Sequence, residues 1–96
     1  MSLYVVSYDV SGPGSGGRRE ALRAALAERQ ASRLSQSTYL LASSESAATV
    51  MSWLEQLAEK QDSLVVVRAT QGNFFFQSPD PTLSAFAAAL NGNEKL

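Results

Sequence analysis

The chain has 96 residues, enough for one domain with a small core and too few for a cofactor domain plus a substrate domain. It contains no cysteine and no histidine, which excludes disulfides, thiolate or imidazole metal sites, and a histidine-based catalytic triad. The net charge of −1 excludes a surface that is positive throughout, and no apolar run is long enough to span a membrane. With no basic, apolar leader, we expect a cytoplasmic protein with no membrane partner.

The first predicted strand, Leu3 to Val10, is a run of β-branched and aromatic residues with an aspartate, Asp9, near its end. An ionisable side chain adds nothing to packing in such a run and must be solvated or paired. Its position at the strand tip therefore makes Asp9 a candidate site residue. The alternative is that Asp9 only ends the strand or caps the following loop, as aspartate often does.

A glycine-rich loop is predicted from Ser11 to Gly17, and it matches the pattern GxGxxG that cradles a pyrophosphate at a helix N-terminus. The chain has no room for a doubly wound sheet, and Arg18-Arg19 stand where a P-loop has Lys and Ser or Thr. We therefore interpret the segment as a mobile loop rather than a nucleotide site. It could still close over a phosphate if Arg18 and Arg19 supply the charge.

The segment from Arg18 to Glu28 predicts a helix, because its apolar residues recur at core-facing helical spacing. Basic residues are concentrated in and just after this helix. Five of the eight lie there: Arg18, Arg19, Arg23, Arg29 and Arg33. This local charge predicts a phosphate-binding face, although the alternative is a solvated helix face that Glu20 and Glu28 partly neutralise.

Further along the chain, residues 33–42 are strand-like, and the polar centre Ser35-Gln36-Ser37 predicts a bend between two short strands. The serine cluster at residues 43–46 predicts the start of a second helix that runs through Lys60. The segment from Asp62 to Arg68 contains a run of consecutive apolar residues, which is typical of a central strand buried on both faces, or of a strand at an interface. Tyr39 and Trp53 could stack on bases, although core packing fits their spacing better.

The C-terminal part predicts a further strand over Gly72 to Gln77 and a short amphipathic helix over Thr82 to Asn91, followed by a frayed tail over about residues 91–96. Three consecutive phenylalanines in the strand cannot all face one core, so we expect a dimer interface there. The whole chain, residues 1–96, is thus predicted as one α+β domain. It would be a ferredoxin-like βαββαβ sandwich with an extra C-terminal strand and helix, a fold that by itself fixes no function.

Residues 3 to 70 together resemble the small CRISPR-associated adaptation family called Cas-two. The resemblance rests on a strand ending in Tyr8-Asp9, arginines that open the following helix, Arg33 before the hairpin residues 36–41, and Asp62-Ser63-Leu64 with Val67-Arg68. It implies a homodimer that exchanges the strand over Gly72 to Gln77, in which the two Asp9 side chains meet at a two-fold axis and hold a divalent metal. The chain departs from the family pattern in its longer glycine-rich loop, its lack of a basic surplus and its appended helix.

The resemblance implies a nucleic-acid-binding homodimer of antiviral defence that binds DNA or RNA and has a larger integrase-type protein as a partner. If the protein is an enzyme, we expect a metal-dependent phosphodiesterase, an endonuclease or endoribonuclease with Asp9 and Tyr8 as catalytic residues. Asp9 would bind Mg²⁺ or Mn²⁺, while Arg18, Arg19 and Arg33 would bind phosphates. The chain is also similar to stand-alone relatives described as SinR-like or grouped near the VapD toxins. The alternative is therefore a non-catalytic dimer that acts as a scaffold or regulatory interaction protein.

Overall fold

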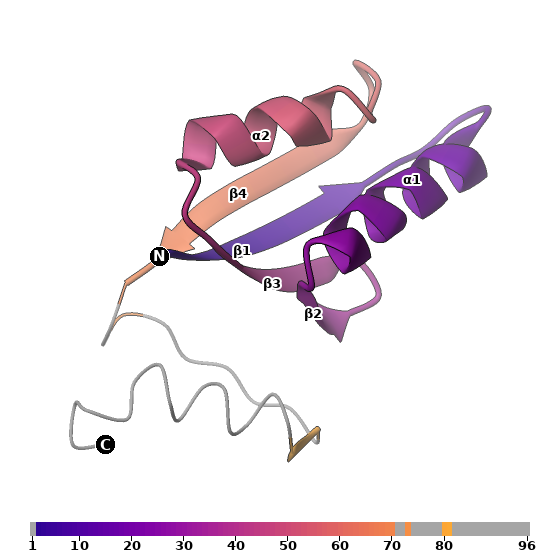
Figure 1. Ribbon diagram of the computed structural model, residues 1–96. Helices are drawn as coiled ribbons and strands as arrows, with labels where there is room; N and C mark the ends of the chain where they lie inside the picture. The colour runs from indigo at the N-terminus through magenta and orange to yellow at the C-terminus, as the bar shows by residue number, and fades with distance from the viewer. Residues whose placement is uncertain (1, 71–72, 74–79, 82–96) are drawn as a thin grey trace.

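The computed structural model describes residues 2–70, 73 and 80–81, which include four strands and two helices between residues 2 and 69. In chain order these are β1 (Ser2–Asp9), α1 (Ser15–Glu28), β2 (Ser32–Ser35), β3 (Thr38–Ser43), α2 (Ala47–Glu55) and β4 (Ser63–Ala69) (Figure 1). The strands form one sheet in the order β2-β3-β1-β4, and each neighbouring pair is antiparallel. The domain is α+β, and this arrangement is compatible with a ferredoxin-like fold.

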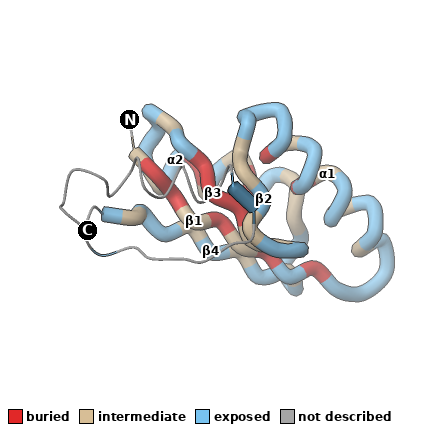
Figure 2. The backbone as a smooth tube through the Cα atoms, turned by 90° about the horizontal axis from the view of Figure 1, so that it is seen from below, coloured by how far each residue is buried: buried red, intermediate tan, exposed pale blue. Residues whose placement is uncertain are grey.

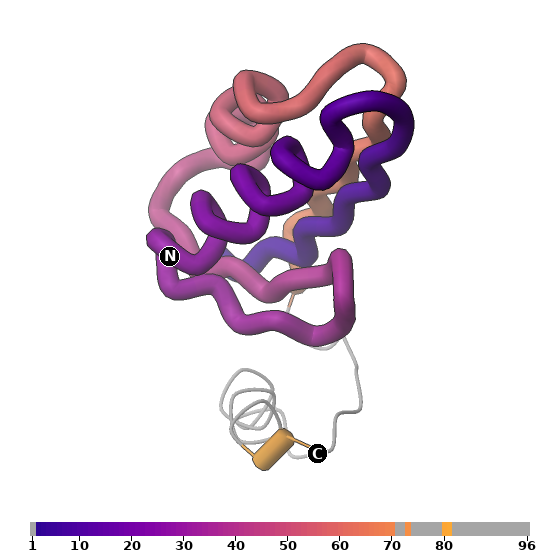
Figure 3. The backbone as a smooth tube through the Cα atoms, turned by 90° about the vertical axis from the view of Figure 1, so that its right-hand side faces the viewer, coloured from indigo at the N-terminus to yellow at the C-terminus, as the bar shows by residue number. Residues whose placement is uncertain are grey.

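The two helices lie side by side on one face of the sheet, as Figures 1 and 3 both show. The main core fills the space between these layers. It comprises Tyr4, Val6, Tyr8 and Val10 from β1 and the residue after it, Tyr39 and Leu41 from β3, Leu22 and Leu26 from α1, and Val50 and Leu54 from α2. The buried parts of β1 and β3 stand out near the middle of the molecule in Figure 2. This face of the sheet is called the helix face below.

The opposite face of the sheet, called here the open face, carries the alternate residues of each strand, because successive side chains of a strand point to opposite sides. Leu3 and Leu40 form a separate buried cluster there, against which Val5, Leu34 and Ala69 pack. Strand register extends this surface onto β4, where Val67 lies opposite Val5 and Val65 opposite Ser7. The open face is therefore apolar at the end that carries Leu3.

Strand β4 is where the structure departs from the prediction of a strand buried on both faces. It lies at one end of the sheet in the part of the chain that the structure describes, and Val65 and Val67 are 48% and 52% exposed. The run of apolar residues reflects two half-covered faces: Leu64 and Val66 pack on the helix face, and Val65 and Val67 lie on the open face. The interface interpretation of this strand stays a prediction.

The other predicted elements agree in position except at two helix boundaries, and α1 begins at Ser15 rather than at Arg18. The bend over Ser35-Gln36-Ser37 is confirmed between β2 and β3, with an irregular register at that end of β2. Helix α2 ends at Glu55 rather than Lys60, because the chain continues through i to i+3 turns that bring Asp62 back toward Glu59. The predicted strand over 72–77, helix over 82–91 and tail over 91–96 lie outside the described residues.

Two glycines shape the loop between β1 and α1. Gly12 and Gly14 have φ of 84° and 78°, the left-handed conformation that other residues adopt at a cost. Gly16 and Gly17 instead lie inside α1, so the GxGxxG match is not one continuous phosphate-binding turn. The loop is also not open, because the guanidinium of Arg18 bonds to the carbonyl oxygens of Ser11 and Pro13.

We predict that Gly14→Ala destabilises the protein by about 1–2 kcal/mol, because alanine resists a left-handed φ. Its Cβ would also lie 3.3 Å from Nη1 of Arg18, so the arginine must shift. Gly16→Ala is the matched control. Its site is helical and its Cβ would meet nothing within 4 Å, so this change should stabilise by about 0.5–1 kcal/mol. Urea unfolding of both variants measures the difference, and equal effects would contradict the assigned loop conformation.

Candidate functional site

Asp9 ends β1 with an exposed side chain. Its carboxylate has no hydrogen-bond or ion-pair partner within the described part of the chain. A cap for the following loop would show such a bond, so the structure gives no support to the interpretation that Asp9 is only a capping residue. An unpaired carboxylate at a strand tip is available to bind a cation.

Three residues with hydroxyl side chains lie near Asp9 on the open face. Ser63 of β4 lies directly opposite Asp9 in the antiparallel register, and Ser7 precedes it by two residues on the same side of β1. Thr38 lies opposite Ser7 on β3, and its hydroxyl donates to the Ser7 hydroxyl at 3.5 Å. The open face therefore has a polar end, made of one carboxylate and three hydroxyls, next to its apolar end.

Tyr8, although adjacent to Asp9 in sequence, lies on the helix face. It is buried in the main core, and its ring stacks on that of Tyr39 with centroids 6.1 Å apart and planes at 19°. Burial, and then the neighbouring Tyr39 phenol, raise the pKa of Tyr8 to about 12, while the charges of Arg33 and Arg19 act in the opposite direction. Tyr8 is thus a neutral hydrogen-bond donor at physiological pH.

Arg33 and Arg19 approach the same helix-face region from different elements. Arg33 lies opposite Tyr39 in the register of β2 and β3, and its guanidinium donates to the carbonyl oxygens of Ser35 and Gln36. Arg19, the fifth residue of α1, donates to the Val10 carbonyl at 3.2 Å. Neither arginine has a carboxylate partner among the described residues. Both charges are therefore uncompensated.

A cavity of about 340 Å³ lies where these elements meet. Its lining joins the end of β1, the N-terminal part of α1 and the β2–β3 turn: Tyr8, Asp9, Val10, Arg19, Gln36 and Ser37. The turn is fixed to the sheet, since the Tyr8 amide donates to the Ser37 carbonyl at 3.2 Å. The cavity thus brings together three of the predicted site residues, Tyr8, Asp9 and Arg19.

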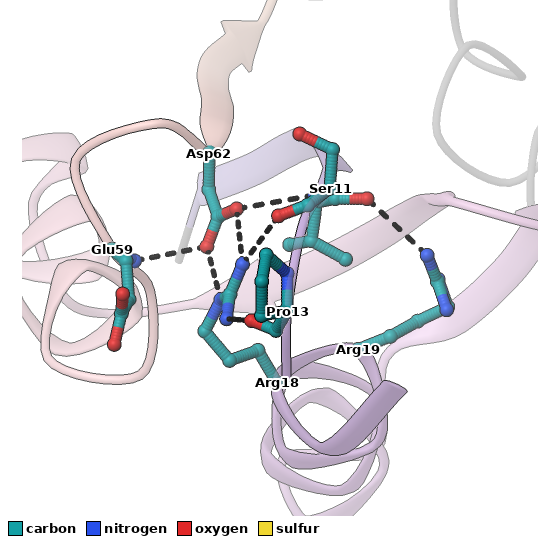
Figure 4. Close-up of polar contacts among 7 residues, drawn as sticks. Ser11, Pro13, Arg18, Arg19, Glu59 and Asp62 are labelled. Atoms are coloured by element: carbon teal, nitrogen blue, oxygen red, sulfur yellow. Dashed lines mark hydrogen bonds and ion pairs between the residues drawn. The ribbon is translucent and has the colours of Figure 1, made fainter. Parts of the chain in front are cut away.

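Arg18 is used differently from Arg19. Its Nε and Nη2 atoms lie 2.7 and 3.0 Å from the two carboxylate oxygens of Asp62, and its other bonds go to the carbonyls of Ser11 and Pro13. Figure 4 shows Arg18 reaching toward Asp62, while Arg19 points away from it. The Arg18 side chain is only 12% exposed and that of Asp62 is 0% exposed. Arg18 thus joins the glycine loop to the segment before β4.

Asp62 is the centre of this Arg18–Asp62 clamp, a role that no local sequence pattern predicts. Besides Arg18, it accepts bonds from the backbone amides of Glu59 at 2.9 Å and Ser11 at 3.4 Å. The Arg18 hydrogen bonds, followed by those of the two amides, lower the pKa of Asp62 from 3.8 to about 2 against the opposing effect of burial. Arg18 and Asp62 are 44 positions apart in the chain, so only the tertiary structure shows that they pair.

The predicted residues therefore fall into three places. Asp9 lies on the open face, and Tyr8, Arg19 and Arg33 on the helix face, while Arg18 lies in the clamp. Tyr39 is buried in the core, which supports packing over base stacking. Trp53 carries the Arg29 guanidinium at 3.7 Å over its ring and donates to Glu45. One ring face of Trp53 is therefore covered.

A single chain offers only part of a metal site. Within the described residues, no three acidic, histidine or cysteine side chains come together in a group that could hold an ion. Asp9 and the surrounding hydroxyls are oxygen donors, which suit Mg²⁺ or Mn²⁺, but one carboxylate is few for either ion. The residues therefore fit a divalent ion only if a second chain supplies another carboxylate.

No protein-family model and no curated protein sequence matches this chain. Among the described residues, neither helix has the length and apolar composition needed to cross a bilayer. Function is therefore inferred from the geometry of the site.

We predict that the Arg18–Asp62 clamp makes stability depend on pH in acid. Since the folded pKa of Asp62 lies below its ordinary value, its contribution is fully present above about pH 4 and is lost as the pH falls toward 2. Asp62→Asn should therefore lower Tm clearly at pH 7 and have a much smaller effect near pH 2. Glu28→Gln, at an 82% exposed side chain, serves as the control. A Tm difference for Asp62→Asn that stays constant from pH 7 to pH 2 would contradict the clamp.

Proposed function

We propose that this protein is a nucleic-acid-binding homodimer of the Cas-two type, built on a ferredoxin-like domain with an added C-terminal strand and helix. The observation that carries the proposal is Asp9, an exposed carboxylate without a partner among the described residues, at the polar end of a sheet face whose other end is apolar. An apolar sheet face with exposed valines favours burial against another surface. A second copy of the chain would bury this face and bring a second Asp9 with it.

The dimer is proposed as a two-fold arrangement in which the open faces pack together. In such an interface each residue has its own symmetry mate, so an axis that passes near the end of β1 would place the two Asp9 carboxylates together. Two like charges in one place repel each other unless a cation lies between them. Two carboxylates together with the hydroxyls of Ser63 and Ser7 would suit Mg²⁺ or Mn²⁺ better than one chain does.

Arg19 and Arg33 are the residues we assign to the nucleic acid. Both guanidinium groups lie at the surface and are not neutralised by carboxylates among the described residues, so they can bind phosphate oxygens. Arg18 is assigned to structure instead, because its nitrogen atoms already have partners. Two contacts per chain on a protein of net charge −1 predict modest, salt-dependent binding.

Cleavage of a phosphodiester is the further step in this proposal. A bound divalent ion would supply charge stabilisation and an activated water, and Asp9 would hold it. Tyr8 lies on the other face of β1 from Asp9, so we assign Tyr8 to substrate contact in the cavity rather than to the metal. The lone carboxylate per chain also favours a second candidate, a non-catalytic dimer that acts as a scaffold or regulatory protein. Clustered acids would be expected in a self-sufficient nuclease site.

We predict that Val67→Asp converts the dimer to a monomer, because it places a charge in the apolar part of the open face. Sedimentation velocity at several protein concentrations measures the mass. The side chain of Val67 is half exposed in the single chain, so the variant should still fold, as circular dichroism would check. Ala24→Asp, at an exposed position of α1, is the matched control and should stay dimeric. A Val67→Asp protein that remains dimeric would exclude this face as the interface.

We predict that the protein binds labelled single- or double-stranded DNA or RNA, and that Arg19→Gln and Arg33→Gln each weaken binding and reduce the salt slope by about one. Lys60→Gln removes the same charge elsewhere and should change little. Asp9→Asn should retain binding but lose any cleavage seen with Mg²⁺ or Mn²⁺. Binding without cleavage in the wild type would support the scaffold, and the absence of binding to all four substrates would overturn the proposed function.

A further inference from the structure

The cavity between β1, α1 and the β2–β3 turn has a chemistry of its own. Four of the six lining residues carry hydrogen-bond donors in their side chains: the Tyr8 phenol, the Arg19 guanidinium, the Gln36 amide and the Ser37 hydroxyl. Asp9 also lines the cavity, but it belongs to the alternate residues of β1, whose side chains lie on the open face. Donors therefore outnumber the single carboxylate in the lining, and the alternation of β1 directs Tyr8 and Asp9 to opposite sides of the sheet.

Positive charge is concentrated around these donors. Arg19 lines the cavity directly, and Arg33 holds the turn that forms its opposite wall through the Ser35 and Gln36 carbonyls. Neither charge is balanced by an acid among the described residues, whereas the nearby Arg23 is paired with Glu20. Two uncompensated guanidinium groups beside neutral donors favour an anion over a neutral or cationic ligand.

Tyr39 supplies a second, independent observation. Its hydroxyl oxygen is buried and has no hydrogen-bond partner among the described residues, although the ring stacks on Tyr8 and lies opposite Arg33 in the strand register. A buried polar atom without a partner carries a free-energy cost, and such atoms are few in folded proteins. Tyr39 does not line the cavity itself, but its ring stacks on Tyr8, which does, and its phenol is close enough to raise the pKa of Tyr8.

We propose that this cavity is a phosphate-monoester site, in which Arg19, Tyr8 and Ser37 hold the phosphate and Arg33 and Tyr39 support them. A monoester has more free oxygen atoms than a diester to accept bonds from such a donor set. The volume of about 340 Å³ also exceeds what a phosphate alone needs and leaves room for an attached sugar. The proposal deepens the nucleic-acid-binding function and depends on it only for the source of the phosphate.

The phosphate could belong to a mononucleotide or to the end of a nucleic-acid strand. Both sources present the same dianionic group, so the cavity chemistry alone does not separate them. Because Asp9 also lines the cavity, a strand end bound there would lie beside the end of β1 that carries this carboxylate. A strand held by its end in one chain could then run toward the proposed two-fold site.

The test is a titration of the full chain with inorganic phosphate at constant ionic strength, followed by ¹H–¹⁵N NMR. We expect saturable shifts confined to the backbone amides of Tyr8, Val10 and Ser37 and the Arg19 Nε–H. Arg19→Gln should weaken binding about tenfold or more, and Tyr8→Phe several-fold. Arg68→Gln, the same change at an exposed position of β4, should have no effect. Shifts that chloride reproduces, or that Arg19→Gln leaves unchanged, would overturn the site.

Two further arms identify the phosphate source. An oligonucleotide with a 5′-phosphate that binds tighter than the same strand with a 5′-hydroxyl, with the difference lost in Arg19→Gln, identifies a strand end. Tighter binding of a nucleoside monophosphate than of either strand identifies a mononucleotide. Val67→Asp separates this site from the proposed function, because it should disrupt the proposed dimer and leave phosphate binding intact. If wild type binds phosphate but no strand, the proposed function fails alone; if strands bind without an Arg19-dependent phosphate response, this site fails alone.

Discussion

The alternation of side chains along β1 is the constraint on which the candidate sites depend. This strand lies between β3 and β4, and its even-numbered residues fill the core under the helices while its odd-numbered residues lie on the open face. Tyr8 and Asp9 are consecutive, yet the pleat sends their side chains to opposite sides of the sheet. A single strand thus supports a donor-lined cavity on one face and a carboxylate on the other.

The surroundings of each face follow from the strand register. Antiparallel pairing places Ser63 beside Asp9, and Val65 and Val67 farther along the open face. On the helix face, pairing places Arg33 beside Tyr39. A slip of one residue in either pairing would move these side chains to the wrong side. Register therefore decides which side chains lie together on each face of the sheet. The large buried residues of the core hold that register in place.

The Arg18–Asp62 clamp keeps the glycine loop in one arrangement. Four hydrogen bonds hold the Arg18 guanidinium against Asp62 and the loop carbonyls, and left-handed Gly12 and Gly14 let the backbone turn around it. The loop that most resembled a nucleotide cradle is therefore occupied by the protein's own side chain. Arg19 instead lines the cavity and donates to the Val10 carbonyl, so two adjacent arginines have separate roles.

Local sequence determined the elements, because strand-forming runs, helical spacing and the bend at residues 35–37 depend on neighbouring residues alone. It also singled out Asp9, since a carboxylate at the tip of an apolar strand needs no tertiary information to be unusual. The end of α2, the edge position of β4, the partner of Arg18 and the environment of Tyr39 were decided only by the tertiary structure. Each depends on residues far apart in the chain, such as Arg18 and Asp62, whose contact no local pattern records.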